Sequence, residues 1–234
     1  MQLKGLLVWK LIVGVVVRAA NYDNSSVKTC KPYPFYAPPI EMDLDKVLGV
    51  WYEYAIYHPP GVFKNPTNYY DKIATVSGTP DVVAVNWTVA LFVQPQGLCS
   101  GFFENVVFSS SGQKNSLTYF VAAGAKGPQQ VFASEIFIDY TVMEIDHRCL
   151  APNVATGTCD DPIFLINTRV KPPLLTQADI DYIEGTFNRV MAPYCFSMAN
   201  LTKSTWDLTL PTCNPVEPPH YKELIELTSK ILTA

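Results

Sequence analysis

Six cysteines are the residues of this chain best able to do chemistry, and they stand at positions 30, 99, 149, 159, 195 and 213. An even number of cysteines is typical of a disulfide-bonded protein. Because no two of them form a Cys-x-x-Cys pair, the spacing argues against a zinc site or a thioredoxin-type redox centre. The sequence therefore predicts three disulfides and no metal.

Two histidines and two glutamates are the other candidates for chemistry. His58 and His147 could ligate haem, but a loop histidine and a strand-end histidine are expected to be exposed instead. The chain contains no Gly-x-Ser-x-Gly sequence, no phosphate-binding loop and no metal-spaced histidine pair. We therefore expect a protein that is not an enzyme and has no resident cofactor, apart from a lipophile or pigment that it binds.

The first 20 residues have the pattern of a secretory signal peptide. A positively charged start precedes the apolar stretch Leu6–Val17, which only Lys10 interrupts, and small residues follow at Ala19 and Ala20. A membrane anchor is the alternative, but it requires about 20 unbroken apolar residues. No later stretch is expected to span a membrane, so the mature protein is predicted to be secreted and extracellular.

Charge and sequons agree with that compartment. Cleavage after residue 20 removes three basic residues and no acid, so the net charge falls from −4 to −7. Such an acidic protein is not expected to bind nucleic acid. Three sequons predict N-glycosylation at Asn24, Asn86 and Asn200.

Short apolar runs separated by turn signals predict an antiparallel β-structure after residue 50. Eight is the number of strands that closes a barrel around one small ligand. The predicted strands are Trp51–Tyr57, Tyr69–Val76, Val82–Phe92, Phe102–Phe108, Leu117–Ala122, Val131–Ile138, Thr141–His147 and Ile163–Thr168.

A single long helix is expected after the last strand. Thr176 is a suitable N-cap, Asp179 completes a capping box, and apolar residues from Ile180 to Met191 recur at helical spacing. We divide the chain into the signal peptide (1–20), one barrel domain with a flanking helix (21–213) and a C-terminal extension (214–234) that could form a second short helix.

Three stretches in this order resemble the lipocalin family. Gly49-Val50-Trp51-Tyr52-Glu53 looks like the first lipocalin motif. Asp139-Tyr140, with Cys149 nine residues after the tyrosine, looks like the second motif of the apolipoprotein D and insect bilin-binding-protein branch. Residues 163–169, which end at Arg169, look like the third. The resemblance covers about residues 28–213 and implies an all-β, eight-stranded, up-and-down antiparallel calycin barrel with the helix packed outside.

The resemblance also implies two contacts. Arg169 is expected to lie over the Trp51 ring, a cation–π contact worth about 0.5–2 kcal/mol that would seal one end of the barrel. A disulfide between Cys30 and Cys149 is expected from the same family. For the remaining four cysteines three pairings are open, and we expect Cys195–Cys213 with Cys99–Cys159.

Strand alternation predicts the pocket. If Asn86 carries a glycan, it faces outward, so Trp87 faces inward with Val85, Val89 and Leu91. An inward Trp51 places Glu53, Ala55 and Tyr57 on the same side. The resemblance places Ile163, Leu165, Ala133, Glu135 and Phe137 inward, and Phe103 and Tyr119 are added although the parity of their strands is open.

Such an interior is apolar and aromatic with a few carboxylates, which suits a lipophilic ligand with one polar end. We therefore expect a secreted lipocalin that carries or sequesters a fatty acid, sterol, retinoid, carotenoid or bilin. The alternative is a lipocalin scaffold that acts through surface contacts with other proteins. An enzyme comes third, with Glu53 and Glu135 as an acid/base pair, and would require a free thiol or a carboxylate of raised pKa in the cavity.

Overall fold

A computed structural model describes residues 29–35, 40, 42–58, 66–78, 82–93, 98–109, 116–122 and 128–215. The predicted signal peptide, the sequon at Asn24 and nearly all of the C-terminal extension lie outside these residues. So do the side chains of several strand residues, including the predicted pocket residues Val85, Trp87, Phe103 and Tyr119.

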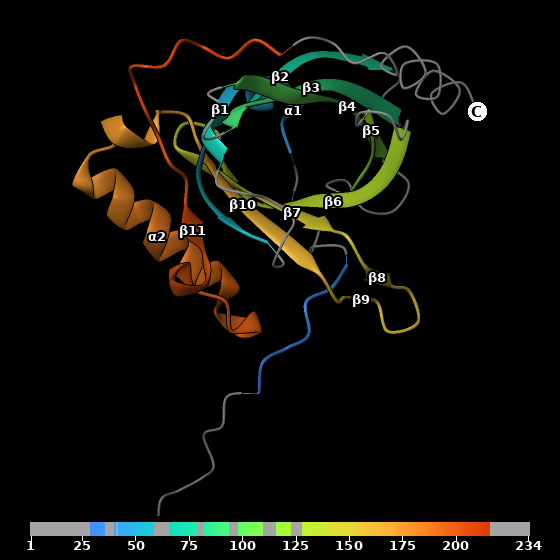
Figure 1. The fold of residues 1–234 in the computed structure, drawn as a ribbon. Helices are drawn as coiled ribbons and strands as arrows, with labels where there is room; N and C mark the ends of the chain where they lie inside the picture. The colour runs from blue at the N-terminus through green and yellow to red at the C-terminus, as the bar shows by residue number, and fades with distance from the viewer. Residues whose placement is uncertain are drawn as a thin grey trace, which may run out of the picture.

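The described residues form a curled antiparallel sheet (Figure 1). Each of its long strands pairs with the next one along the sheet, and β1 pairs with β2 on one side and with β10 on the other. The sheet therefore curls back on itself. Its long strands are β1 (Gly49–Tyr57), β2 (Pro66–Gly78), β3 (Val82–Val93), β4 (Leu98–Ser109), β5 (Ser116–Ala122), β6 (Pro128–Asp139), β7 (Met143–Cys149) and β10 (Pro162–Thr168).

All eight predicted strands are present, and most are longer at their ends than predicted. The one strand that starts later than predicted is β7, which starts at Met143 instead of Thr141. The Asp139 side chain accepts hydrogen bonds from the Thr141 amide and hydroxyl, and the Val142 amide donates to the Asp139 carbonyl. These bonds close a tight turn, so residues 140–142 cannot join the sheet.

Short elements fill the connections between the long strands and after the helix. β8 (Pro152–Asn153) and β9 (Thr158–Cys159) pair in the β7–β10 connection, and β11 (Thr202–Lys203) pairs with β1. The remaining short elements are the helix α1 (Leu44–Val47) and the 3₁₀ helices η3 (Pro172–Leu174), η4 (Ala192–Tyr194) and η5 (Met198–Asn200).

Trp51 and Arg169 make the predicted contact where β1 starts. The guanidinium carbon of Arg169 lies 3.5 Å from the centroid of the Trp51 ring, which is fully buried. Arg169 also donates hydrogen bonds to the carbonyls of residues 46, 47, 48, 50 and 140. Gly49 has a φ of +116°, and a Cβ there would lie 3.1 Å from Arg169 Nη1, so this position favours glycine.

Helix α2 (Gln177–Met191) begins as predicted, with a capping box between Thr176 and Asp179. Its buried side chains, including Ile183 and Phe187, pack on the outer face of β1, β7 and β10. Figure 1 shows the helix beside the curled sheet. No helix in the part of the chain that the structure describes is both long and apolar enough to cross a membrane.

The sheet has an inner and an outer apolar cluster. The inner cluster joins side chains from strands on opposite sides of the curl, such as Trp51 and Tyr69 with Ala133 and Leu165. The outer cluster joins side chains of β1, β7 and β10 to α2 and to Tyr33 of the N-terminal segment. We use "inner face" and "outer face" in this sense.

All six cysteines form disulfides, but every predicted pairing is wrong. The bonds are Cys30–Cys195, Cys99–Cys213 and Cys149–Cys159. The N-terminal segment runs beside the end of α2, where the Lys31 amide donates to the Pro193 carbonyl, so Cys30 meets Cys195. The β7–β10 connection folds back at the end of β7, which brings Cys159 to Cys149. Residues 206–214 cross the outer face and bring Cys213 to Cys99 on β4.

We predict that Arg169→Lys lowers the free energy of unfolding by about 2 kcal/mol, because an ammonium cannot reproduce the planar fork that reaches several carbonyls at once. Urea unfolding followed by tryptophan fluorescence measures the change. Arg189→Lys is the matched control, since within the described part of the chain Arg189 makes a single side-chain hydrogen bond, to Thr186 on its own helix. Equal stabilities of the two variants would contradict the role assigned to Arg169.

Candidate functional site

An irregularity in β1 decides which of its side chains face inward. The register with β10 pairs Glu53 with Asn167, then skips a residue and pairs Ala55 with Ile166. Glu53 therefore shares the inner face with Trp51, whereas Ala55 packs in the outer cluster. Tyr57 also faces outward, 5.8 Å from the Phe164 ring centroid, so its assignment to the pocket was wrong. The extra residue at the bulge reversed the expected alternation.

A second bulge acts in the same way on β6. Glu135 pairs with Asp146 of β7, but after the bulge Phe137 pairs with Ile145, which belongs to the outer cluster. Glu135 therefore faces inward as predicted, while Phe137 faces outward and its assignment to the pocket was wrong. The partners across the strands show that β7 turns Glu144, Asp146 and Arg148 inward.

These strands together build a group of buried carboxylates on the inner face, which we call the acidic floor. Each of its side chains is at most 3% exposed. Asp71 joins the group from β2, where it is the direct partner of Trp51. The members of the acidic floor are Glu53, Asp71, Glu135, Glu144 and Asp146.

A few donors hold the acidic floor in place. Asn167 Nδ2 donates to Glu144 Oε1 at 3.1 Å and to Asp71 Oδ2 at 3.3 Å. Arg148 Nε donates to Asp146 Oδ2 at 2.8 Å. The Ser204 hydroxyl donates to Glu53 Oε1. These donors are one guanidinium, one amide and one hydroxyl, and the acidic floor has five carboxyl groups.

Several oxygens of the acidic floor have no hydrogen-bond partner among the described residues. They are Glu53 Oε2, Glu144 Oε2 and Asp146 Oδ1. A buried ionised carboxylate without a partner costs several kcal/mol, so such groups either bind a proton or are met by a cation. Within the described residues, no group of three or more His, Cys, Asp and Glu side chains is arranged to hold a metal ion.

The pKa values of the floor reflect this environment. Burial raises the pKa of Glu53 to about 7 and that of Glu144 to about 8. Burial, followed by the charges of Glu144 and Asp146, raises the pKa of Glu135 well above its ordinary value. Burial also raises the pKa of Asp146, although Arg148 opposes the change. The acidic floor therefore holds protons near neutral pH that a cationic group could replace.

The other predicted pocket residues divide into two groups. Val89, Leu91 and Leu165 are buried in the inner cluster, as expected. The remaining four, whose side chains lie outside the described residues, stay predictions: Val85, Trp87, Phe103 and Tyr119.

The residues of the second motif have local roles. The Tyr140 carbonyl accepts a hydrogen bond from Arg169, and the Tyr140 hydroxyl oxygen accepts one from the Asp43 amide. Asp139 caps its own turn and accepts a bond from the Tyr182 hydroxyl on α2. Asn200 is exposed, as a glycosylation site must be, whereas the side chain of Asn86 lies outside the described residues.

His147 is buried on the outer face, so the expectation that it is exposed was wrong. Its ring centroid lies 4.5 Å from that of Tyr33, and its Nδ1 lies 3.2 Å from Ser134 Oγ. Burial lowers its pKa to about 3, so the imidazole is neutral. The N-terminal segment, which the disulfide of Cys30 holds in place, covers His147. The sequence did not indicate this contact.

Sequence reasoning missed Asp71, Glu144, Asp146, Arg148 and Asn167. The signal was present in Met143–Cys149, where charged residues alternate with other residues at a spacing of two. Charged positions of a strand normally face solvent, so the pattern alone gives the opposite orientation. Because α2 and the N-terminal segment cover the outer face, the charged side chains of this strand face inward instead.

We predict that the free energy of unfolding falls as the pH rises from about 4.5 to about 8. A carboxyl group with a raised pKa keeps its proton in the folded protein after the unfolded chain has lost it. The loss of stability is therefore absent below pH 4.5, which is the ordinary pKa of the carboxyl group. It is complete above the pKa of the group in the folded protein, which is about 7 for Glu53. Glu53→Gln is expected to remove on the order of 3 kcal/mol of this fall.

Urea unfolding at several pH values between 4.5 and 8.5 measures that fall. Asp160→Asn is the control, because this exposed carboxylate lies outside the acidic floor and should leave the pH dependence unchanged. A Glu53→Gln variant whose stability follows the wild-type pH profile would contradict the assignment.

Comparison with known proteins supports the fold. No family model and no curated protein matches the sequence. Among solved structures, insecticyanin from the tobacco hornworm Manduca sexta is similar, with 12% identity, a TM-score of 0.55 and coverage of 80% of this chain and 90% of that one. The tryptamine complex of the amine-binding protein of Rhodnius prolixus has 10% identity, a TM-score of 0.53 and coverage of 87% and 96%.

The allergen Per a 4 from cockroaches is also similar, with 14% identity, a TM-score of 0.51 and coverage of 77% of this chain and 96% of that one. At these identities the likeness concerns the fold, which is an antiparallel eight-stranded sheet with one C-terminal helix. The chain therefore shares its overall fold with these structures, in agreement with the resemblance of its three motifs to the lipocalin family. Its membership of that family, its place in the apolipoprotein D branch and the closed barrel stay predictions.

Proposed function

We propose that this protein is a secreted, glycosylated binding protein whose sheet forms a closed barrel around a small organic amine. The protonated nitrogen would lie on the acidic floor, and the apolar body would lie against side chains such as Val89, Leu91 and Leu165. The three disulfides agree with an extracellular site of action.

The unpartnered oxygens of Glu144 and Asp146 carry this proposal. An ammonium group would supply the donors that these oxygens lack and would offset the cost of keeping their charges away from water. A fatty acid or a bilin would instead bring its own carboxylate toward five others, which raises the electrostatic energy. An organic amine was not among the ligand classes expected from the sequence, and the acidic floor favours it over the fatty acid and the bilin that were.

The similar fold of the Rhodnius prolixus amine-binding protein adds support. That protein is known in complex with tryptamine, and its overall structure matches most of the present chain. At this low identity no residue role is transferred from one protein to the other, and the buried carboxylates of this chain carry the proposal. Tryptamine is nevertheless a suitable first probe, because it joins an aromatic body to one ammonium group.

An enzyme was expected to need either a free thiol or a carboxylate of raised pKa, and the raised pKa values of Glu53, Glu135 and Glu144 meet that requirement. A free thiol is not present, because all six cysteines form disulfides. We favour a binding role, because a group of buried acids of the same charge is suited to hold a cation.

We predict that tryptamine binds at pH 8 and that tryptophol, which has a hydroxyl in place of the amine, binds at least about tenfold more weakly. Glu144→Gln and Glu135→Gln are each expected to weaken tryptamine binding by about tenfold and to leave tryptophol unchanged. Isothermal titration calorimetry measures both ligands, and Asp160→Asn is the control variant.

Equal affinity for the amine and the alcohol would overturn the amine proposal. If neither ligand binds, and a panel of other amines and uncharged lipophiles also fails, the alternative of a scaffold that acts through surface contacts is favoured instead. A lower affinity at pH 5 than at pH 8 is part of the expected result, because the protonated floor carries less negative charge.

A further inference from the structure

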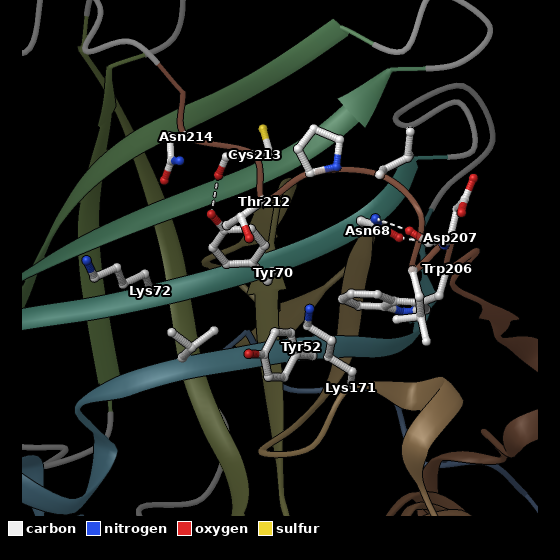
Figure 2. A pocket seen from close by; sticks show the side chains of 14 residues that line it. Tyr52, Asn68, Tyr70, Lys72, Lys171, Trp206, Asp207, Thr212, Cys213 and Asn214 are labelled. Atoms are coloured by element: carbon white, nitrogen blue, oxygen red, sulfur yellow. Dashed lines mark hydrogen bonds between the residues drawn. The ribbon is translucent and has the colours of Figure 1, made fainter.

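A cavity lies on the outer face of the sheet, away from the acidic floor (Figure 2). It has a volume of about 230 Å³ and lies between strands β1 and β2 on one side and residues 206–214 on the other. We call it the outer pocket. Its size suits a small molecule rather than a long lipid.

Three aromatic side chains form much of its lining. The ring centroids of Tyr52 and Trp206 are 5.7 Å apart with an edge-to-face geometry, and those of Tyr52 and Tyr70 are 6.3 Å apart. Trp206 Nε1 donates to the Glu53 carbonyl at 2.9 Å, which fixes the indole against β1. Figure 2 shows these rings facing the space between the strands and the C-terminal segment. A planar aromatic molecule could pack against them.

The C-terminal wall is fastened to the sheet at both ends. At one end Asn68 Nδ2 donates to the Asp207 carbonyl and the Asp207 amide donates to Asn68 Oδ1, each at 2.7 Å. At the other end Cys213 is bonded to Cys99, and the Tyr70 hydroxyl donates to the Cys213 carbonyl. The outer pocket is therefore formed before any ligand arrives, which lowers the entropic cost of binding.

The charge at this pocket is opposite to that of the whole chain. Lys72 and Lys171 line it, and among the described residues neither forms an ion pair. Lys171 Nζ lies 5.8 Å from the centroid of the Tyr52 ring. The carboxylate of Asp207 is engaged in its own turn, where it accepts bonds from the Thr209 amide and hydroxyl. The ammonium groups of Lys72 and Lys171 are therefore available to pair with an anionic ligand.

We propose that the outer pocket binds a small aromatic carboxylate. The ring system would pack against Tyr52, Tyr70 and Trp206, and the carboxylate would pair with Lys171 and Lys72. This site takes an anion and the acidic floor takes a cation, so the two sites select ligands of opposite charge and do not depend on each other.

Titration with 2-naphthoate tests the outer pocket. The expected result is saturable binding that shifts the indole N–H resonance of Trp206, with 2-naphthylmethanol at least about fivefold weaker because it lacks the charge. Lys171→Met and Lys72→Met keep the apolar stem and remove the charge, and each is expected to weaken 2-naphthoate binding by about threefold or more. Lys31→Met, at an exposed lysine outside the pocket, is the matched control.

Saturating tryptamine should leave the affinity for 2-naphthoate unchanged, which separates this proposal from that of the acidic floor. Competition between the two ligands would overturn the outer site, and so would 2-naphthoate binding that both lysine variants leave intact. No detectable binding of 2-naphthoate would also overturn it. Because both lysines are on the surface of the pocket, their substitution is not expected to impair folding.

Discussion

The contact between Trp51 and Arg169 is the interaction on which the rest of the structure depends. It joins the start of β1 to the end of β10, the two strands whose pairing brings the sheet back on itself. It also fixes the direction of β1, because a buried Trp51 turns Glu53 inward and Tyr52 outward. The acidic floor and the outer pocket lie on opposite faces of that same strand.

A closed apolar cover on the outer face explains how the inner face can be acidic. Helix α2 and the N-terminal segment bury the outer side of β7 and β10, including His147 and Phe164. The hydrophobic effect of that cover stabilises the fold from outside. The inner face is then free to carry carboxylates whose burial would otherwise be too costly, and their raised pKa values are the measure of that cost.

Much of the fold could be predicted from the sequence because its signals are local. Alternating apolar residues and turn residues predict the eight strands, and the Thr176 capping box predicts the start of α2. The site could be predicted only in part. Two bulges, after Glu53 and after Glu135, turn Tyr57 and Phe137 outward, although alternation assigned Tyr57 inward and the resemblance assigned Phe137 inward. Bulges leave no clear mark in this sequence. The disulfide pairing failed because it depends on how distant segments lie together.

The charge pattern of β7 also could not be interpreted from the sequence alone. Glu144, Asp146 and Arg148 stand at every second position, as in a strand with one solvated face, and only the position of α2 and the N-terminal segment shows that this face is the inner one. The outer pocket was equally hidden, because only Tyr52 and Tyr70 are partners across β1 and β2. Trp206 comes from the C-terminal segment, which a disulfide between residues 114 positions apart joins to the sheet. Both the acidic floor and the outer pocket therefore depend on segments that are distant in the sequence and cover the sheet.

A crystal structure of the protein with tryptamine tests the central claim most directly. The account predicts electron density for the ligand on the inner face, with its ammonium nitrogen within hydrogen-bonding distance of Glu144 or Asp146 and its indole against the inner cluster. Density for tryptamine on the outer face alone, or an inner ligand whose nitrogen points away from the acidic floor, would contradict it.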